Sequence, residues 1–262
     1  MIQSNIYTLI KRYWTIVILV TLSSGPLFSN LLTEDTYYQE HILPIDPTPN
    51  QTYQVVSYIT PKSFHPLSGD SFVSTLWELC TGTLSSMHIG KYQTQRACLA
   101  QSILSEEKGD EILFRVTIQE DLFWEGVKEG EFEDLAPQFL EKHPVTSLDF
   151  KLWLETIQNP HIEMPGAKSL RNYFCHITEI EVIDDKNFIV HWEKGERVPY
   201  GVSYIVGQLK PLPHFIYGYF INGEKILEEG SYKTNFLFAK HLENHWAQKT
   251  LISCGPWKLQ SH

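Results

Sequence analysis

The segment HLENH, residues 241 to 245, carries the residue pattern that most suggests metal chemistry. His241 and His245 are four residues apart, so on a helix they share one face and could hold a zinc ion together. In zinc proteases the catalytic glutamate directly follows the first histidine, where it reaches the metal-bound water. Glu243 instead lies two residues after His241, and the sequence offers no evident third ligand. A zinc hydrolase is therefore an alternative interpretation and not the leading one.

Nucleophilic and nucleotide-dependent chemistry finds little support. No GxSxG elbow, Walker A loop or GxGxxG turn follows a predicted strand. Cys254, beside Gly255, is a candidate nucleophile, but nothing in the sequence assigns it a histidine partner. The residue types favour a binding protein over an enzyme, and no pattern predicts a cofactor or a bound metal.

The cysteines leave two interpretations open. An even number of them would permit two disulfides, with three connectivities, in an oxidising compartment. Buried free thiols are the alternative, because an isolated cysteine is among the most buried residue types. No CxxC pair occurs, which argues against a tetrathiolate zinc site. The cysteines are Cys80, Cys98, Cys175 and Cys254.

Composition indicates a globular chain that avoids nucleic acid. The 262 residues are 42% hydrophobic and 13% aromatic, enough to bury a core of one large domain or two small ones. Lys and Arg total 21 against 31 Asp and Glu, which gives a net charge of −10. Because this charge repels phosphate backbones, a nucleic-acid partner is excluded.

The first 29 residues are predicted to be a signal peptide or a signal anchor. Lys11 and Arg12 precede an uncharged apolar run, residues 14–22, that is too short to cross a bilayer comfortably. The chain is therefore expected in the periplasm or at the outer face of the inner membrane. A buried helix of a cytosolic protein is the alternative. Residues 30–52, which contain several prolines, are predicted to form an extended lead-in.

Local patterns predict the elements that follow. Residues 53–60, rich in Val, Tyr and Ile, predict a buried strand that ends at Pro61. Asp70 is placed to cap a helix over 71–81, with Gly82 as its stop. Apolar residues at every second position over 111–118 predict a strand with one buried face.

The second half of the chain predicts two helices and a hairpin. Thr146 and Asp149 form a variant of the capping box at the start of a helix that Pro160 must end. A shorter helix is predicted around residues 169–174, and residues 177–194 predict a β-hairpin. An amphipathic stretch follows at 236–248. The acidic stretch from Glu125 predicts a solvated loop and not a calcium site.

Taken in order, these segments resemble the amino-terminal half of the family 5 extracellular solute-binding proteins, the peptide- and nickel-binding receptors of ABC importers. The similarity covers about residues 53–259. The segments that carry it are the first strand with its PLSGD loop and helix, RACLAQSI with ILFRVTIQEDLFW, HPVTSLDFKLWLETI, ITEIEVIDDKNFIVHW, LPHFIY and CGPWKL.

The resemblance implies an α/β fold of the periplasmic binding protein type II kind, with a mixed sheet and helices. In this family the Gly-Pro-aromatic turn comes just before the chain crosses a hinge into a second lobe. Residues 53–262 would then be a truncated first lobe. Its expected partners are an oligopeptide or similar small solute and the membrane subunits of an ABC transporter, with weak or no function in isolation.

The same resemblance suggests a substrate-binding wall. Residues that follow the carboxyl end of the first strand occupy the usual ligand position of an α/β sheet. In the final turn, a glycine allows close backbone approach and a tryptophan offers a stacking face. The predicted binding residues are Phe64, His65, Ser68, Cys254, Gly255, Pro256 and Trp257.

Another function remains open beside the zinc hydrolase. The chain could be an exported interaction protein that pairs with another chain through its exposed hinge and cleft surface. Stoichiometric zinc that disappears when His241 and His245 are replaced would favour the hydrolase. Partner capture under native conditions would favour the interaction protein.

Overall fold

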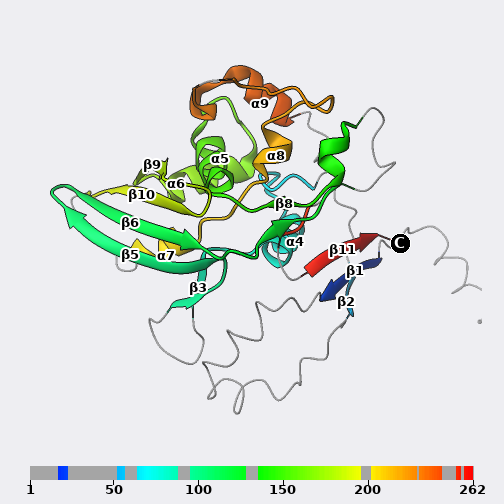
Figure 1. Cartoon of the computed structure of the whole chain (residues 1–262), viewed down its shortest axis with the longest axis horizontal. Helices are drawn as coiled ribbons and strands as arrows, with labels where there is room; N and C mark the ends of the chain where they lie inside the picture. Colours follow the sequence, from blue (N-terminus) through cyan, green and yellow to red (C-terminus); the bar gives the residue numbers. More distant parts are fainter. Residues whose placement is uncertain are drawn as a thin grey trace, which may run out of the picture.

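A four-stranded antiparallel sheet forms the largest part of the fold (Figure 1). The computed structural model describes residues 17–22, 52–56, 64–87, 95–127, 135–195, 202–228, 230–243, 252–254 and 257–261. The sheet has the order β5-β6-β10-β9. Its strands are β5 (Ala100–Lys108), β6 (Glu111–Ile118), β9 (Ile177–Val182) and β10 (Asn187–Glu193).

Alternating side chains on the two central strands build one buried face. Ile112, Phe114, Val116 and Ile118 of β6 are all buried, as the sequence predicted. In β10, Phe188, Val190 and Trp192 are buried in the same manner, with Val190 opposite both Phe114 and Ile180. The predicted strand at 111–118 and the predicted hairpin are confirmed.

Helix α5 (Ser147–Gln158) covers this face, and α6 (Pro165–Tyr173) packs against α5 (Figure 1). The capping box at Thr146 is present, and Asn159 ends α5 just before Pro160. Phe150 of α5 stacks on Phe188 with ring centroids 5.2 Å apart, which fixes the helix on the sheet.

Helix α4 (Ser71–Thr81) has both ends that the sequence predicted. The Asp70 carboxylate accepts hydrogen bonds from the backbone N–H groups of Phe72 (2.8 Å) and Val73 (3.3 Å). Gly82 ends the helix with a φ of 77°, a left-handed conformation that favours glycine. Leu76 and Cys80 are buried, while Phe72 is half-buried.

The remaining elements are short. There are two two-stranded ribbons among the described residues. One pairs β3 (Ser85–Met87) with β4 (Gln95–Ala97), and the other pairs β7 (Phe123–Trp124) with β8 (His143–Pro144). The short helices are η2 (Pro137–Leu140), α7 (Val202–Gly207), α8 (His214–Tyr217), η3 (Tyr232–Thr234) and α9 (Phe236–Glu243). Val127, within the stretch predicted to be a solvated loop, is buried, and so is Phe139 of η2 directly after that stretch, so both pack against the core.

A second sheet joins segments that are far apart in the sequence. Strand β1 (Val17–Leu22) lies between β2 (Thr52–Val56) and β11 (Trp257–Ser261), antiparallel to both. The predicted strand at 53–60 is thus confirmed up to Val56, and residues 57–60 lie outside the described residues. The apolar run interpreted as a targeting segment supplies the central strand here, and the signal peptide stays a prediction. Apart from Thr52, the lead-in of residues 30–52 also lies outside the described residues.

The fold combines helices and sheets, as the α/β class that the sequence predicted requires. The predicted mixed sheet is wrong for the described residues, because every strand pairing that the structure describes is antiparallel. Among the helices of the described ranges, none combines the length and the apolar composition needed to cross a membrane.

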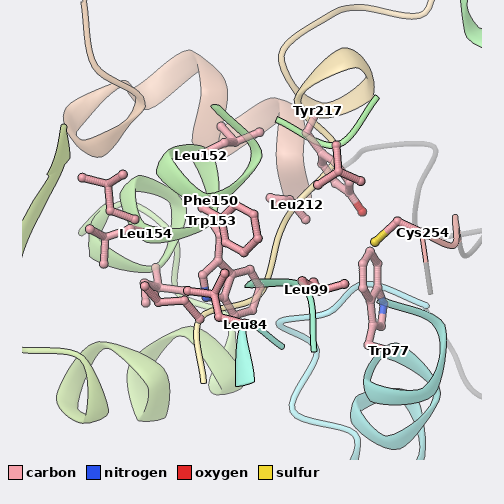
Figure 2. Packing of buried hydrophobic residues seen from close by; sticks show 14 of the residues in the cluster. Trp77, Leu84, Leu99, Phe150, Leu152, Trp153, Leu154, Leu212, Tyr217 and Cys254 are labelled. Carbon is pink, nitrogen blue, oxygen red and sulfur yellow. The ribbon is translucent and has the colours of Figure 1, made fainter. Parts of the chain in front are cut away.

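The largest core side chains come from many elements. Figure 2 shows Phe150, Leu152, Trp153 and Leu154 of α5 packed in the same cluster as Trp77 of α4. The four cysteines are free thiols: Cys80 and Cys254 are buried, Cys98 is half-buried and Cys175 is exposed. The disulfide interpretation is not realised in this structure.

Candidate functional site

The loop before α4 is held in a fixed shape by short-range hydrogen bonds. The ring Nδ1 of His65 accepts a hydrogen bond from the Leu67 N–H (3.0 Å), and Ser68 Oγ accepts one from the Asp70 N–H (3.3 Å). The indole N–H of Trp77 donates to the Phe64 carbonyl (2.7 Å) and ties the loop to the helix. These bonds hold residues 64–70 in place at the start of α4.

Residues 252–254 dock on the carboxyl end of α4. The last carbonyls of a helix have no partner inside it and need donors from elsewhere. The Cys80 carbonyl accepts from the Cys254 N–H (3.1 Å) and from Ser253 Oγ (2.7 Å), while Cys254 Sγ donates to the Thr81 carbonyl (3.4 Å). A segment 173 residues away therefore completes the end of this helix.

Both segments contact α4, and we call these five residues the α4 wall: Phe64, His65, Ser68, Trp77 and Cys254. In Figure 2 the Cys254 sulfur lies at the Trp77 ring, and Tyr217 lies beside it. Tyr217 also contacts His65 edge to face, with ring centroids 6.2 Å apart. The structure thus brings together residues from both predicted binding segments.

Burial divides the members of the α4 wall into two groups. Phe64 and Ser68 are half-buried. His65 and Cys254 are 1% and 8% exposed, so they support the wall from behind and do not offer their side chains to a ligand in this conformation. Gly255 and Pro256 lie outside the described residues, and Trp257 is described only as a backbone position in β11.

The buried groups of the wall are uncharged near neutral pH. Burial lowers the pKa of His65 to about 3, so its ring is neutral. Burial raises the pKa of Cys80 to about 12. For Cys254, burial and then the charge of Asp149 raise the pKa of the thiol well above its usual value. Because the thiolate is the nucleophile, Cys254 is unsuited to the catalytic role considered above.

A buried carboxylate next to this region joins three segments, and the sequence predicted only part of its role. Asp149 is 2% exposed and accepts hydrogen bonds from the Thr146 N–H (2.8 Å), the Trp124 indole N–H (2.9 Å) and the His214 N–H (2.7 Å). The spacing from Thr146 revealed the first bond. No local pattern indicated Trp124 or His214. Asp149 therefore fixes the positions of β7, α5 and α8 relative to one another.

Asp149 should make stability depend on pH. Burial raises the pKa of this carboxyl to about 6, against the lowering effects of its three donors and of Lys186. Since the native state then holds the proton more tightly than the unfolded chain, this stabilising effect is complete near pH 4 and lost as the pH rises through about 6. The measurement is the urea midpoint across this range for the protein and for Asp149→Asn. The stability difference between them should shrink from pH 4 to about 7 and stay constant above that, and a difference that grows with pH would contradict the assignment.

Of the two histidines in the zinc interpretation, the structure describes only His241. His241 lies in α9, where its ring contacts Phe220 edge to face at 5.0 Å, and burial lowers its pKa. His245 lies outside the described residues. Over the part of the chain that the structure describes, no group of three potential metal ligands occurs.

The chain was compared with known proteins at three levels. No family model matches it, and no curated protein matches it. Among solved structures, it matches NikZ from Campylobacter jejuni in complex with Ni(L-His), at 15% identity and a TM-score of 0.45 over 76% of this chain and 31% of that one. It also matches the periplasmic binding protein DppA from Helicobacter pylori in complex with the peptide STSA, at 17% identity and a TM-score of 0.45 over 74% of this chain and 33% of that one.

A third match is OppA from Haemophilus influenzae in complex with the peptide RPPGFSPFR, at 20% identity and a TM-score of 0.40 over 59% of this chain and 29% of that one. The matched structures are solute-binding proteins of the family that the motif order resembles. This chain spans about a third of the length of the structures it matches.

Proposed function

We propose that this chain supplies one wall of a solute-binding cleft in a peptide importer of the ABC type. The observation that carries the proposal is the meeting of two segments on α4. The loop at Phe64 and the turn at Cys254 are the two places where the resemblance puts ligand contacts. Both hydrogen-bond to α4 although they lie at opposite ends of residues 64–254.

The order of elements also supports the proposal. Each motif that carries the resemblance coincides with an element of the expected kind where the structure describes it. Examples are the capped helix α4, the central strand β6 and the hairpin β9–β10. The sharp start of α5 at the PVTSLD segment is a further example.

The wall alone should bind peptide weakly. Solute-binding clefts enclose most of the ligand, and their affinity comes from groups that converge from two sides. With one side present, the cost of immobilising the ligand remains while a large part of the contacts is lost. Since every 1.4 kcal/mol is about tenfold in affinity, a loss of several kcal/mol moves a micromolar site to roughly 100 micromolar or weaker.

The test is titration of the full chain with a pool of short peptides. Saturation-transfer NMR detects weak binding and calorimetry detects tight binding. We expect NMR signals with dissociation constants weaker than about 100 micromolar, and a further loss of signal in Trp257→Ala. Leu104→Ala is the control, because Leu104 lies exposed on β5.

Three outcomes would contradict the proposal. A low-micromolar calorimetric signal abolished by Trp257→Ala would show that one wall recognises the solute unaided. The absence of any peptide signal from correctly folded protein at about 10 mM peptide would show that the wall is not a peptide site. Signals that persist equally in Trp257→Ala and Leu104→Ala would place binding elsewhere.

A further inference from the structure

A pocket of about 410 Å³ lies beside α5 and shares no lining residue with the α4 wall. Its volume falls in the range of small-molecule sites, ~300–1,000 Å³. Residues of α8 and the segment from Tyr219 to Tyr232 close it on one side. On the other side, spacing of three and four residues places one face of α5 against it: Leu148, Lys151, Leu152 and Glu155.

A tight turn shapes the rim of this pocket. Tyr219 and Lys225 form an antiparallel bridge, and two backbone hydrogen bonds flank it: Phe220 N–H to the Glu224 carbonyl (2.8 Å) and Ile226 N–H to the Gly218 carbonyl (2.9 Å). Gly223 allows the turn with a φ of 89°. The backbone of Lys225 is thus fixed beside that of Tyr219, and both residues line the pocket.

Three of the lining residues, His214, Tyr219 and Tyr232, form an aromatic and uncharged end of the pocket. His214 is anchored through its backbone N–H on Asp149, and its ring lies edge to face against Tyr219 and Tyr232 at 6.0 Å each. His214 Nε2 and the Tyr232 hydroxyl are 3.4 Å apart. Burial and the charge of Lys225 lower the pKa of His214, so the ring is neutral near pH 7. This end offers an apolar surface with two groups that can form hydrogen bonds.

Charged side chains of both signs line the pocket without pairing with each other. They are Lys151, Glu155, Lys225 and Glu228. One oxygen of Glu155 accepts the Tyr232 N–H at 2.9 Å. Within the described part of the chain, the side chains of Lys151, Lys225 and Glu228 take part in no ion pair or hydrogen bond. A ligand that carries both charges would satisfy the two signs at once.

We propose that this pocket binds a free α-amino acid with an apolar or aromatic side chain. The ligand carboxylate is held by Lys151 and Lys225, and its ammonium group by Glu228. Its side chain packs on Leu148, Leu227 and the ring of Tyr219. This inference does not rest on the proposed peptide cleft, because the two sites have no residue in common.

Calorimetry on the full chain tests the charge pattern of the ligand. L-leucine and L-phenylalanine are compared with their N-acetyl and amide derivatives, each of which lacks one of the two charges. We expect saturable binding of the free amino acids with a dissociation constant of about 1 mM or tighter, and at least about tenfold weaker binding of both derivatives.

Variants locate the site. Lys151→Met combined with Lys225→Met should weaken binding of the free amino acid by at least about tenfold. Lys168→Met, a matched change of an exposed lysine in α6 outside the pocket, should leave binding unchanged. Glu228→Gln should weaken binding of the free amino acid but not of its N-acetyl derivative, which has no ammonium group. Because Glu228 is exposed and outside any helix or strand, this variant should fold even where the lysine variant does not.

The proposal is wrong if the blocked derivatives bind as tightly as the free amino acids. It is equally wrong if folded double-lysine protein binds like the original, or if folded original protein gives no saturable heat at about 10 mM amino acid.

Discussion

Asp149→Ala is expected to lower the free energy of unfolding by an amount comparable with a large part of the total. The change leaves three buried donors without an acceptor: the N–H groups of Thr146 and His214 and the indole of Trp124. Each unsatisfied buried group costs about 1–3 kcal/mol, so the sum for three groups is on the order of 3–9 kcal/mol. Typical domains have only about 5–15 kcal/mol in total. Urea unfolding followed by circular dichroism measures the effect.

A matched control variant and a double-mutant cycle show whether the loss of stability comes from the hydrogen bonds of Asp149. Asp121→Ala removes an exposed aspartate from a turn and should change stability by less than about 0.5 kcal/mol. Trp124→Phe removes only one of the three donors, so it should cost less in the Asp149→Ala background than in the original protein. If the alanine variant does not fold, the same cycle can be measured with Asp149→Asn. Equal costs of Trp124→Phe in both backgrounds would contradict the assigned hydrogen bond.

Phe150→Ala is expected to cost about 3–5 kcal/mol, because it opens a cavity between α5 and the four-stranded sheet. Phe150 is fully buried, and its ring stacks on Phe188 of β10. Thermal and urea unfolding give the measurement. Leu148→Ala, two residues earlier on an exposed part of the same helix, should change stability by less than about 1 kcal/mol.

The size dependence separates a packing effect from a local effect on the helix. Phe150→Leu keeps most of the buried volume and should recover more than half of the loss. An alanine variant that matches Leu148→Ala in stability would mean that the α5–sheet contact contributes little to the fold.

Elements with local signals could be predicted from the sequence. Asp70 and Gly82 mark the ends of α4 because a cap and a left-handed glycine act within a few residues of the helix. Strand β6 shows regular alternation because one of its faces is buried. Strand β5, at the edge of the same sheet, has mostly exposed side chains, and its pairing with β6 comes from the partner strand and not from its own pattern.

The candidate site was predictable only in part. The position of Phe64 and Ser68 after a strand indicated a ligand-facing loop. The burial of His65 depends on Tyr217, which arrives from a distant segment. The docking of Cys254 on the Cys80 carbonyl likewise joins residues that no local window contains. Long-range contacts of this kind are set by packing of the whole domain, so spacing along the sequence does not reveal them.

The charges on the outer strands of the four-stranded sheet bear on how the protein behaves in concentrated solution. An edge strand has backbone groups that could pair with a second molecule, and charged side chains oppose such pairing. Strand β5 carries Glu106 and Glu107, and β9 carries Glu179 and Glu181, all exposed. In a protein of net charge −10, edges with excess glutamate repel each other at neutral pH. Acidification weakens this barrier against aggregation. Because a hydrogen bond from Lys194 and its charge lower the pKa of Glu107, that residue keeps its charge into more acidic solution.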